Sequence, residues 1–198
     1  SGATFAHGLG SQVNLSIVKR TDATSYWYVY SSLLPSNNNL YLNTSDGKQA
    51  DGVMLGGNTT TVSISASTSV NANGGQYVAY NFTSKPGFSK VGSYTGTGAA
   101  GQYVITGFEP AFVMVKTTSS TSNWFILDNK RNSNNPRNSY LMANSGAAQA
   151  TAGTGINFLS NGFELESTAF NDPADWIYIA FAADGSTATP SLANSFAT

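Results

Sequence analysis

The most polar stretch of the chain, Asp128–Asn138, carries the side chains best suited to hold a ligand. It contains one carboxylate, three cationic side chains and several amides. Guanidinium and amide groups recognise sugar hydroxyls and carboxylates through paired hydrogen bonds. The candidate ligand-binding residues of this loop are therefore Asp128, Asn129, Lys130, Arg131, Asn134 and Arg137. A solvated loop without a ligand is the alternative that the sequence leaves open.

Two carboxylates, Glu164 and Glu166, lie two positions apart in an alternating segment that predicts a strand. Their side chains would point to the same side of that strand about 6–7 Å apart, a separation also found between paired glycosidase carboxylates. Every solvent-facing side of a strand has this spacing, and no third carboxylate follows in Ser167–Ala169. We therefore expect no catalytic residues and predict a protein that is not an enzyme.

Metal and nucleophile chemistry have few residues available. His7 is the only histidine and there is no cysteine, which excludes Cys-ligated zinc, a thiolate nucleophile and disulfides. His7 lies in a glycine-rich turn, so we expect a structural role for it. Calcium takes about six to eight oxygen ligands, and Asp172 and Asp175 could supply some of them. A plain turn explains this loop as well, so we expect no cofactor, with calcium as the alternative.

Strands must position these residues. Apolar and polar residues alternate in most periodic segments, as in Trp27–Tyr30 and Phe163–Glu166, and a period of two is typical of antiparallel sheets. Clusters of Gly, Asn, Ser and Thr separate the segments, and Asn161-Gly162 predicts a hairpin turn. The Ala-rich segment Gly146–Ala152 predicts a helical turn or two. The fold class that follows is all-β, with antiparallel β-sandwiches of jelly-roll or lectin-like type.

The order of the segments recurs roughly 100 residues further along the chain, the length of a small domain. Leu15–Lys19 is followed at a fixed spacing by Trp27, and Phe112–Lys116 is followed at the same spacing by Trp124. Such self-similarity indicates two tandem copies of one unit. We predict a first sandwich over 1–84, a second over 85–183, and a tail rich in Ser, Thr and Ala over 184–198. One larger jelly roll built from two half-units is the alternative.

The three tryptophans have indole faces that could stack on sugar rings. Trp27 and Trp124 occupy the same place in the two predicted copies, within a strand, and this favours a core position for both. Trp176 follows a polar loop and has Tyr77 as its counterpart. We therefore add Trp176 to the candidate ligand-binding residues.

The second copy begins with an alternating segment, Gly87–Gly96, that has no counterpart before Ser1. A unit built on the same plan would leave a sheet edge exposed, and such edges recruit further strands. The place could be filled by Pro190–Phe196 of a neighbouring chain, or by polypeptide preceding Ser1 in a longer protein. We therefore expect a homo-oligomer, with a trimer as one arrangement.

Charged residues make up only 10% of the chain, and the net charge is −1. Without a run of Lys or Arg there is no field to attract nucleic acid or an anionic membrane surface. Apolar stretches stay well short of the ~18 residues of a membrane span. We expect neither nucleic-acid binding nor membrane insertion. A surface made polar by Ser, Thr and Asn is typical of extracellular and virion proteins.

Five segments carry a resemblance to a known group of proteins: Gly87–Gly96, Gly107-Phe108, Asn123–Asp128, Phe158–Phe163 and Tyr178–Ala182. They resemble the tandem β-rich repeats of appendage and tail-fibre-like proteins of marine bacteriophages, which often accompany lectin-like modules. The resemblance covers about residues 5–183. It implies a virion-surface location and other virion proteins as partners, and it implies no catalytic residues.

Two functions of different classes remain. In the first, the chain is a non-enzymatic virion-surface protein, tail-fibre-like or in the outer capsid, that binds a host-surface glycan through loops of a β-sandwich. In the second, it is a structural, assembly or capsid-decoration subunit without a ligand. Host attachment through carbohydrate binding is the main hypothesis, because the loop at Asp128–Asn138 has diverged from its counterpart while the strands have not.

Overall fold

The structure, a computed structural model, describes residues 1–183 and divides into two compact units. The first comprises Ser1–Thr83 with Ser120–Ser122, and the second comprises Ser84–Ser119 and the residues from Asn123 onward. Strands dominate both units and pair in the antiparallel sense. The all-β prediction is therefore confirmed. The segment Pro190–Phe196, expected to donate a strand, lies outside the described residues.

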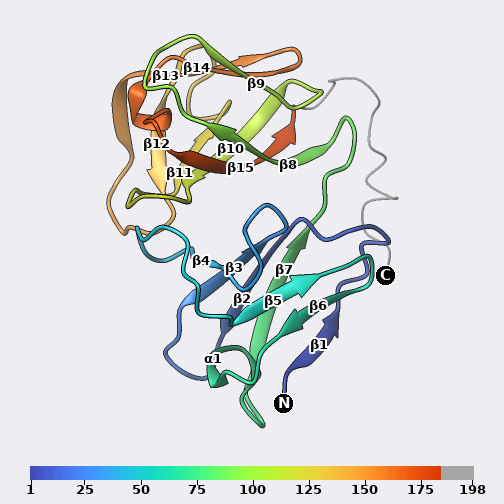
Figure 1. The fold of residues 1–198 in the computed structure, drawn as a ribbon. Coiled ribbons are helices and arrows are strands. Elements are labelled where there is room, and N and C mark those ends of the chain that lie inside the picture. The colour runs from blue at the N-terminus through green and yellow to red at the C-terminus, as the bar shows by residue number, and fades with distance from the viewer. Residues whose placement is uncertain (184–198) are drawn as a thin grey trace. The chain divides into compact units, whose positions relative to one another are not determined.

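Two sheets make up the first unit (Figure 1), one with the order β4-β3-β2-β7 and the other with the order β1-β6-β5. Val18 and Tyr28 of the first sheet share an apolar core with Met54, Val62 and Ile64 of the second. Side chains buried between two antiparallel sheets give the unit its sandwich character. The elements are β1 (Ala3–Ala6), β2 (Leu15–Arg20), β3 (Trp27–Ser31), β4 (Leu40–Tyr41), β5 (Met54–Gly57), β6 (Thr61–Ile64), α1 (Thr68–Asn71) and β7 (Tyr77–Phe82).

One eight-stranded sheet forms the second unit, in the order β8-β15-β10-β11-β12-β13-β14-β9. It curves around a single apolar core that includes Val113, Phe125 and Tyr178 from one half and Ile156 and Phe163 from the other. The sheet is nearly closed. Its elements are β8 (Ser89–Thr95), β9 (Gln102–Ile105), β10 (Pro110–Thr117), β11 (Phe125–Asp128), β12 (Arg137–Met142), β13 (Ala150–Leu159), β14 (Gly162–Leu165), the 3-10 turn Thr168–Phe170 and β15 (Asp175–Ala182).

The central strands of the two units pair in the same order. Strand β2 lies between β3 and β7, and β10 lies between β11 and β15. Lys19 is opposite Val78 in the first unit, and Lys116 is opposite Ile177 in the second. The outer edges differ within residues 1–183. Strand β8 pairs with the other side of β15 in seven residue pairs, whereas β7 is the last strand of its sheet.

The segment Gly146–Ala152 is not helical, and the expectation of a helical turn there is wrong. Ala150 already belongs to β13 and pairs with Tyr140 of β12. Alanine has the highest intrinsic helix propensity, but propensity is a weak determinant of structure, and cross-strand pairing overrides it here.

The hairpin at Asn161-Gly162 is present, with Leu159 of β13 paired to Gly162 of β14. Gly162 is needed mainly because another strand approaches it closely. A Cβ on this residue would lie 2.1 Å from the carbonyl oxygen of Val104 in β9, and the φ angle of Gly162 is +157°.

The three tryptophans have different environments. Trp124 is 2% exposed, and Trp176 is 1% exposed in the core of the second unit, where its ring stacks on that of Tyr94 at 5.9 Å between centroids. The Trp176 Nε1–H donates to the carbonyl oxygen of Asp172 (3.1 Å). Its assignment as a ligand-binding residue is therefore wrong, because core packing occupies the ring. Trp27 is only partly buried, so the core position expected for it is also wrong.

Replacing Trp176 with Ala should lower the free energy of unfolding of the second unit by about 3–5 kcal/mol, the usual effect of truncating a large aromatic residue in a core. The measurement is urea denaturation followed by fluorescence and circular dichroism. Tyr103→Ala serves as the control, because the Tyr103 side chain is 63% exposed and its loss should change stability by less than about 0.5 kcal/mol. Equal stability of the two variants would contradict the core assignment.

Candidate functional site

The polar loop after β11 is held largely by its own side chains. Asp128 accepts hydrogen bonds through Oδ1 from the N–H groups of Lys130 and Arg131 (2.9 and 2.6 Å), and its Oδ2 pairs with the Arg131 guanidinium at 3.2 Å. Arg131 also donates to the side chain of Gln149 (2.9 Å). Lys130 and Asn134 are exposed. The structure thus brings Asp128 and Arg131 together, but as an internal ion pair.

Arg137 at the start of β12 is 7% exposed and does not reach outward. Its guanidinium lies 5.4 Å from the centre of the Phe158 ring and donates to the carbonyl oxygen of Asn132. Burial lowers the pKa of Arg137, while the charges of Glu109 and Asp128 act in the opposite direction. The remaining loop candidate, Asn129, donates its N–H to the Ala111 carbonyl oxygen (2.9 Å). The loop arginines therefore stabilise their own surroundings.

Glu164 and Glu166 do share one side of the sheet, as their spacing predicts, and both contact one amide. The Asn157 side chain donates to Glu164 (3.0 Å) and to Glu166 (2.9 Å). The hydrogen bond from Asn157 is the main cause of a lowered pKa of Glu164, and a hydrogen bond from Tyr103 is the second cause. A general acid of a glycosidase needs a raised pKa, so the shift of Glu164 is in the direction opposite to that role.

His7 and the Asn171–Asp175 loop form structural hydrogen bonds. The ring of His7 accepts from the Leu9 N–H at Nδ1 (3.2 Å), which leaves Nε2 to donate to the Asn58 carbonyl oxygen (3.0 Å). The Asn171 side chain accepts from the Thr97 N–H (3.0 Å) and donates to the Ala99 carbonyl oxygen (2.6 Å). Within residues 1–183, no three His, Asp or Glu side chains gather where a metal ion could be held.

A shallow, open pocket of about 630 Å³ lies in the first unit, at the end of β2 and β3. Trp27, Lys19 and Val78 form its floor, because Lys19 pairs with Trp27 on one side and with Val78 on the other. The side chains of directly opposite residues share one face of the sheet. The remaining lining residues are Arg20, the last residue of β2, and the turn residues that follow it: Thr21, Asp22, Ala23 and Thr24.

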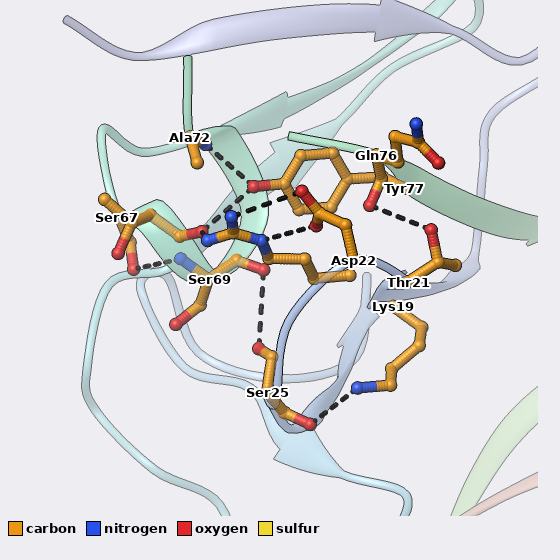
Figure 2. A network of polar contacts seen from close by, with 11 residues as sticks. Lys19, Thr21, Asp22, Ser25, Ser67, Ser69, Ala72, Gln76 and Tyr77 are labelled. Carbon is orange, nitrogen blue, oxygen red and sulfur yellow. Dashed lines mark hydrogen bonds and ion pairs between the residues drawn. The ribbon is translucent and has the colours of Figure 1, made fainter. Parts of the chain in front are cut away.

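Polar contacts hold the rim of this pocket in place (Figure 2). Lys19 donates from Nζ to the Ser25 carbonyl oxygen (2.9 Å), which closes the turn. Arg20 pairs with Asp22 at 2.7 Å and donates to the Thr68 carbonyl oxygen of α1 (2.9 Å). The hydroxyl of Tyr77 donates to the same Thr68 oxygen (2.9 Å). The hydrogen bond from Arg20 lowers the pKa of Asp22, so this carboxylate stays ionised at neutral pH.

Sequence patterns alone did not identify this pocket. Lys19, Arg20 and Asp22 look like the solvated end of any pair of strands, and Trp27 follows Lys19 at the same spacing as the buried Trp124 follows Lys116. The only available signal was the tryptophan itself beside a turn of mixed charge. An indole face next to a carboxylate, an ammonium and hydroxyls can bind a molecule that has an apolar face and several polar groups.

In comparisons with known proteins, a family model described as Domain of unknown function (DUF7483) matches residues 1–184. No curated protein and no solved structure matches the chain. Within residues 1–183, no helix is both long enough and apolar enough to span a membrane.

Replacing Arg20 with Met should raise the pKa of Asp22 toward its ordinary value, because the hydrogen bond from Arg20 is the main cause of the lowering. Any stability that Asp22 contributes is complete above its unfolded-state pKa and is lost as the pH falls through its lower folded-state pKa. Carboxyl chemical shifts followed by NMR from pH 2 to 7 measure the change. Lys130→Met is the control, and an unmoved Asp22 titration in Arg20→Met would refute the pairing.

Replacing Arg137 with Ala should lower the melting temperature by a few degrees, because the packing of its side chain on Phe158 is lost. Lys130→Ala should leave the melting temperature unchanged, since Lys130 is exposed. Differential scanning calorimetry compares the two variants. A loop that served a ligand rather than the fold would show the same melting temperature for both.

Proposed function

We propose a non-catalytic glycan-binding function for this chain, which belongs to the family described as Domain of unknown function (DUF7483). The pocket at Trp27 is the proposed binding site, in place of the polar loop after β11. The ligand would be a saccharide that lays the C–H face of a pyranose ring on the indole. Its hydroxyl or carboxylate groups would reach the charged rim.

The observation that supports this proposal is the partial exposure of Trp27 in a pocket. A large aromatic residue at a central sheet position is normally buried, and Trp124, which follows the same spacing after a lysine, is 2% exposed. Trp27 instead forms the floor beside Lys19, with Asp22 at the rim. Such a residue is placed to contact a ligand.

The pocket offers both donors and acceptors of hydrogen bonds. Asp22 accepts, and the ammonium of Lys19 and the guanidinium of Arg20 donate. Saccharide hydroxyls both donate and accept, so a rim of mixed charge suits them better than it suits a purely anionic ligand. The lowered pKa of Asp22 keeps the acceptor available over the neutral and mildly acidic range.

The proposal includes an internal duplication of one unit, as the sequence predicts. It is supported by the matching strand orders β3-β2-β7 and β11-β10-β15. It is also supported by a matching hydrogen bond at the two tryptophans. The N–H of Trp27 donates to the Asn43 side chain (2.9 Å), and the N–H of Trp124 donates to that of Asn144 (2.9 Å). The jelly-roll type of each unit stays part of this proposal.

We place the protein at the surface of a virion, in a tail-fibre-like or capsid component that assembles with its own copies and with other virion proteins. The support is the resemblance to marine phage repeats and a surface with few charges. A structural or decoration subunit without a glycan is the second candidate. Within residues 1–183 strand β7 pairs with β2 alone, and this favours that candidate, because free strand edges serve assembly.

Screening a glycan array with the fluorescent chain, followed by calorimetric titration of the best saccharide, tests the proposal. Trp27→Ala should weaken binding by at least about tenfold, since stacking of one ring on an aromatic face contributes about 1–3 kcal/mol. Trp27→Phe should recover part of the affinity. Arg131→Ala, which alters the polar loop after β11, is the matched control and should bind like the unmodified chain.

The Trp27→Ala variant should keep its melting temperature to within a few degrees, because Trp27 is only partly buried. Loss of binding with a large loss of stability would assign Trp27 to the fold. Absence of saturable binding anywhere on the array would refute the glycan proposal and leave the assembly role.

A further inference from the structure

We propose that the free edge of β7 docks an extended strand from another polypeptide, with side chains that follow the pattern of β8 but with a larger residue at the position of Gly92. Within residues 1–183, β7 pairs with β2 alone, whereas β15 pairs with β10 and with β8 (Figure 1). The inference rests on the correspondence of the two units and is independent of the glycan pocket.

The backbone of β7 has the groups that strand addition needs. The N–H of Thr21 donates to the carbonyl oxygen of Gln76 (2.9 Å). In an antiparallel pair every second residue is hydrogen-bonded to the neighbouring strand, so this bond and the register show which residues of β7 bond to β2. By that alternation Tyr77, Ala79 and Asn81 direct their N–H and C=O groups away from β2. Ala79 is exposed, and its neighbour Tyr80 is 48% exposed. The row of groups is open to a partner.

The other three edges of the first unit are poorly suited to this role. Strand β4 has only two residues, β1 has four, and β5 carries a register shift between Met54 and Gly56. Short strands and bulges are the usual protection of sheet edges. Strand β7 has six residues, with an unbroken register against β2 and neither a charge nor a proline. Strand addition is therefore most favourable at β7.

The second unit shows what the incoming strand contributes to the core. Tyr94 of β8 is opposite Trp176, stacks on it with an interplanar angle of 4°, and belongs to the apolar core. Tyr77 is the residue of β7 opposite Arg20, as Trp176 is opposite Thr117 at the end of β10. Tyr77 is only partly buried, so an aromatic residue on a docked strand would cover it.

The docked strand should differ from β8 in the size of one side chain, at the position of Gly92. Tyr178 is opposite Gly92, and a Cβ on Gly92 would lie 2.4 Å from the Tyr178 hydroxyl oxygen. Ala79 takes the place of Tyr178 in β7, opposite Val18. The small alanine leaves room for a side chain on the partner strand. A second copy of β8 is a poor occupant, because its seven pairs with β15 would have to break.

Fluorescence anisotropy of labelled peptides added to the full chain tests this proposal. One peptide has the sequence of Gly87–Gly96, and the other carries Gly92→Val. We expect the valine peptide to bind about tenfold tighter, the effect of burying one branched aliphatic side chain. Absence of binding by either peptide up to about 1 mM, or tighter binding by the glycine peptide, would overturn the proposal.

The variant Ala79→Pro loses an N–H group that points away from β2 and keeps the backbone hydrogen bonds to β2. It should weaken binding of the valine peptide at least tenfold. Thr4→Pro is the matched control, because Thr4 lies on the edge strand β1 of the other sheet. Equal binding by the two variants would place the peptide elsewhere. The Trp27→Ala variant should bind the valine peptide with unchanged affinity. Peptide binding and glycan binding are therefore tested separately, and one proposal can fail without the other.

Amide hydrogen exchange supplies a measurement that needs no substitution. The N–H groups of Ala79 and Asn81 should exchange quickly in the free chain and slow at least tenfold when the valine peptide is bound. The N–H of Tyr80, which faces β2, should change little. Slow exchange of Ala79 in the free chain would show that the edge is already paired and would refute the proposal.

Discussion

In each unit a central strand is hydrogen-bonded along both edges, β2 between β3 and β7 and β10 between β11 and β15. This pairing decides which side chains can meet. Lys19 lies between Trp27 and Val78 because of the register of three strands, and the turn after β2 only adds the rim. The floor of the proposed glycan site is thus as rigid as the sheet, which lowers the entropic cost of binding.

The strands and their register follow from local patterns, but burial does not. Alternation places Trp27 and Trp176 on definite faces of their strands, yet it cannot tell what covers each face. Trp176 is buried because β8, more than eighty residues earlier in the chain, brings Tyr94 onto its ring. Such contacts have no local signal. The sequence therefore predicted a surface role for Trp176 and a core role for Trp27, and both interpretations were wrong.

The polar loop after β11 shows a second limit. Its composition predicts an exposed, irregular segment, and Lys130 and Asn134 are exposed as expected. Composition does not show that Arg131 is held by Gln149 or that Arg137 packs on Phe158, since both partners come from β13 or the segment before it. Charged residues can serve the fold as readily as a ligand. Internal hydrogen bonds hold the side chains of this loop, and the sequence carries no local signal of them.

The two proposed sites of the first unit share one strand, and this links them physically. Val78 belongs to the pocket floor, and it is also part of the free edge strand β7. In the second unit the residue opposite Ile177 is Ser93 of β8. A strand docked on β7 would likewise place one residue opposite Val78, on the same face as Lys19 and Trp27. That residue would lengthen the floor, so the docked strand and the saccharide would each change the affinity of the other by the same factor.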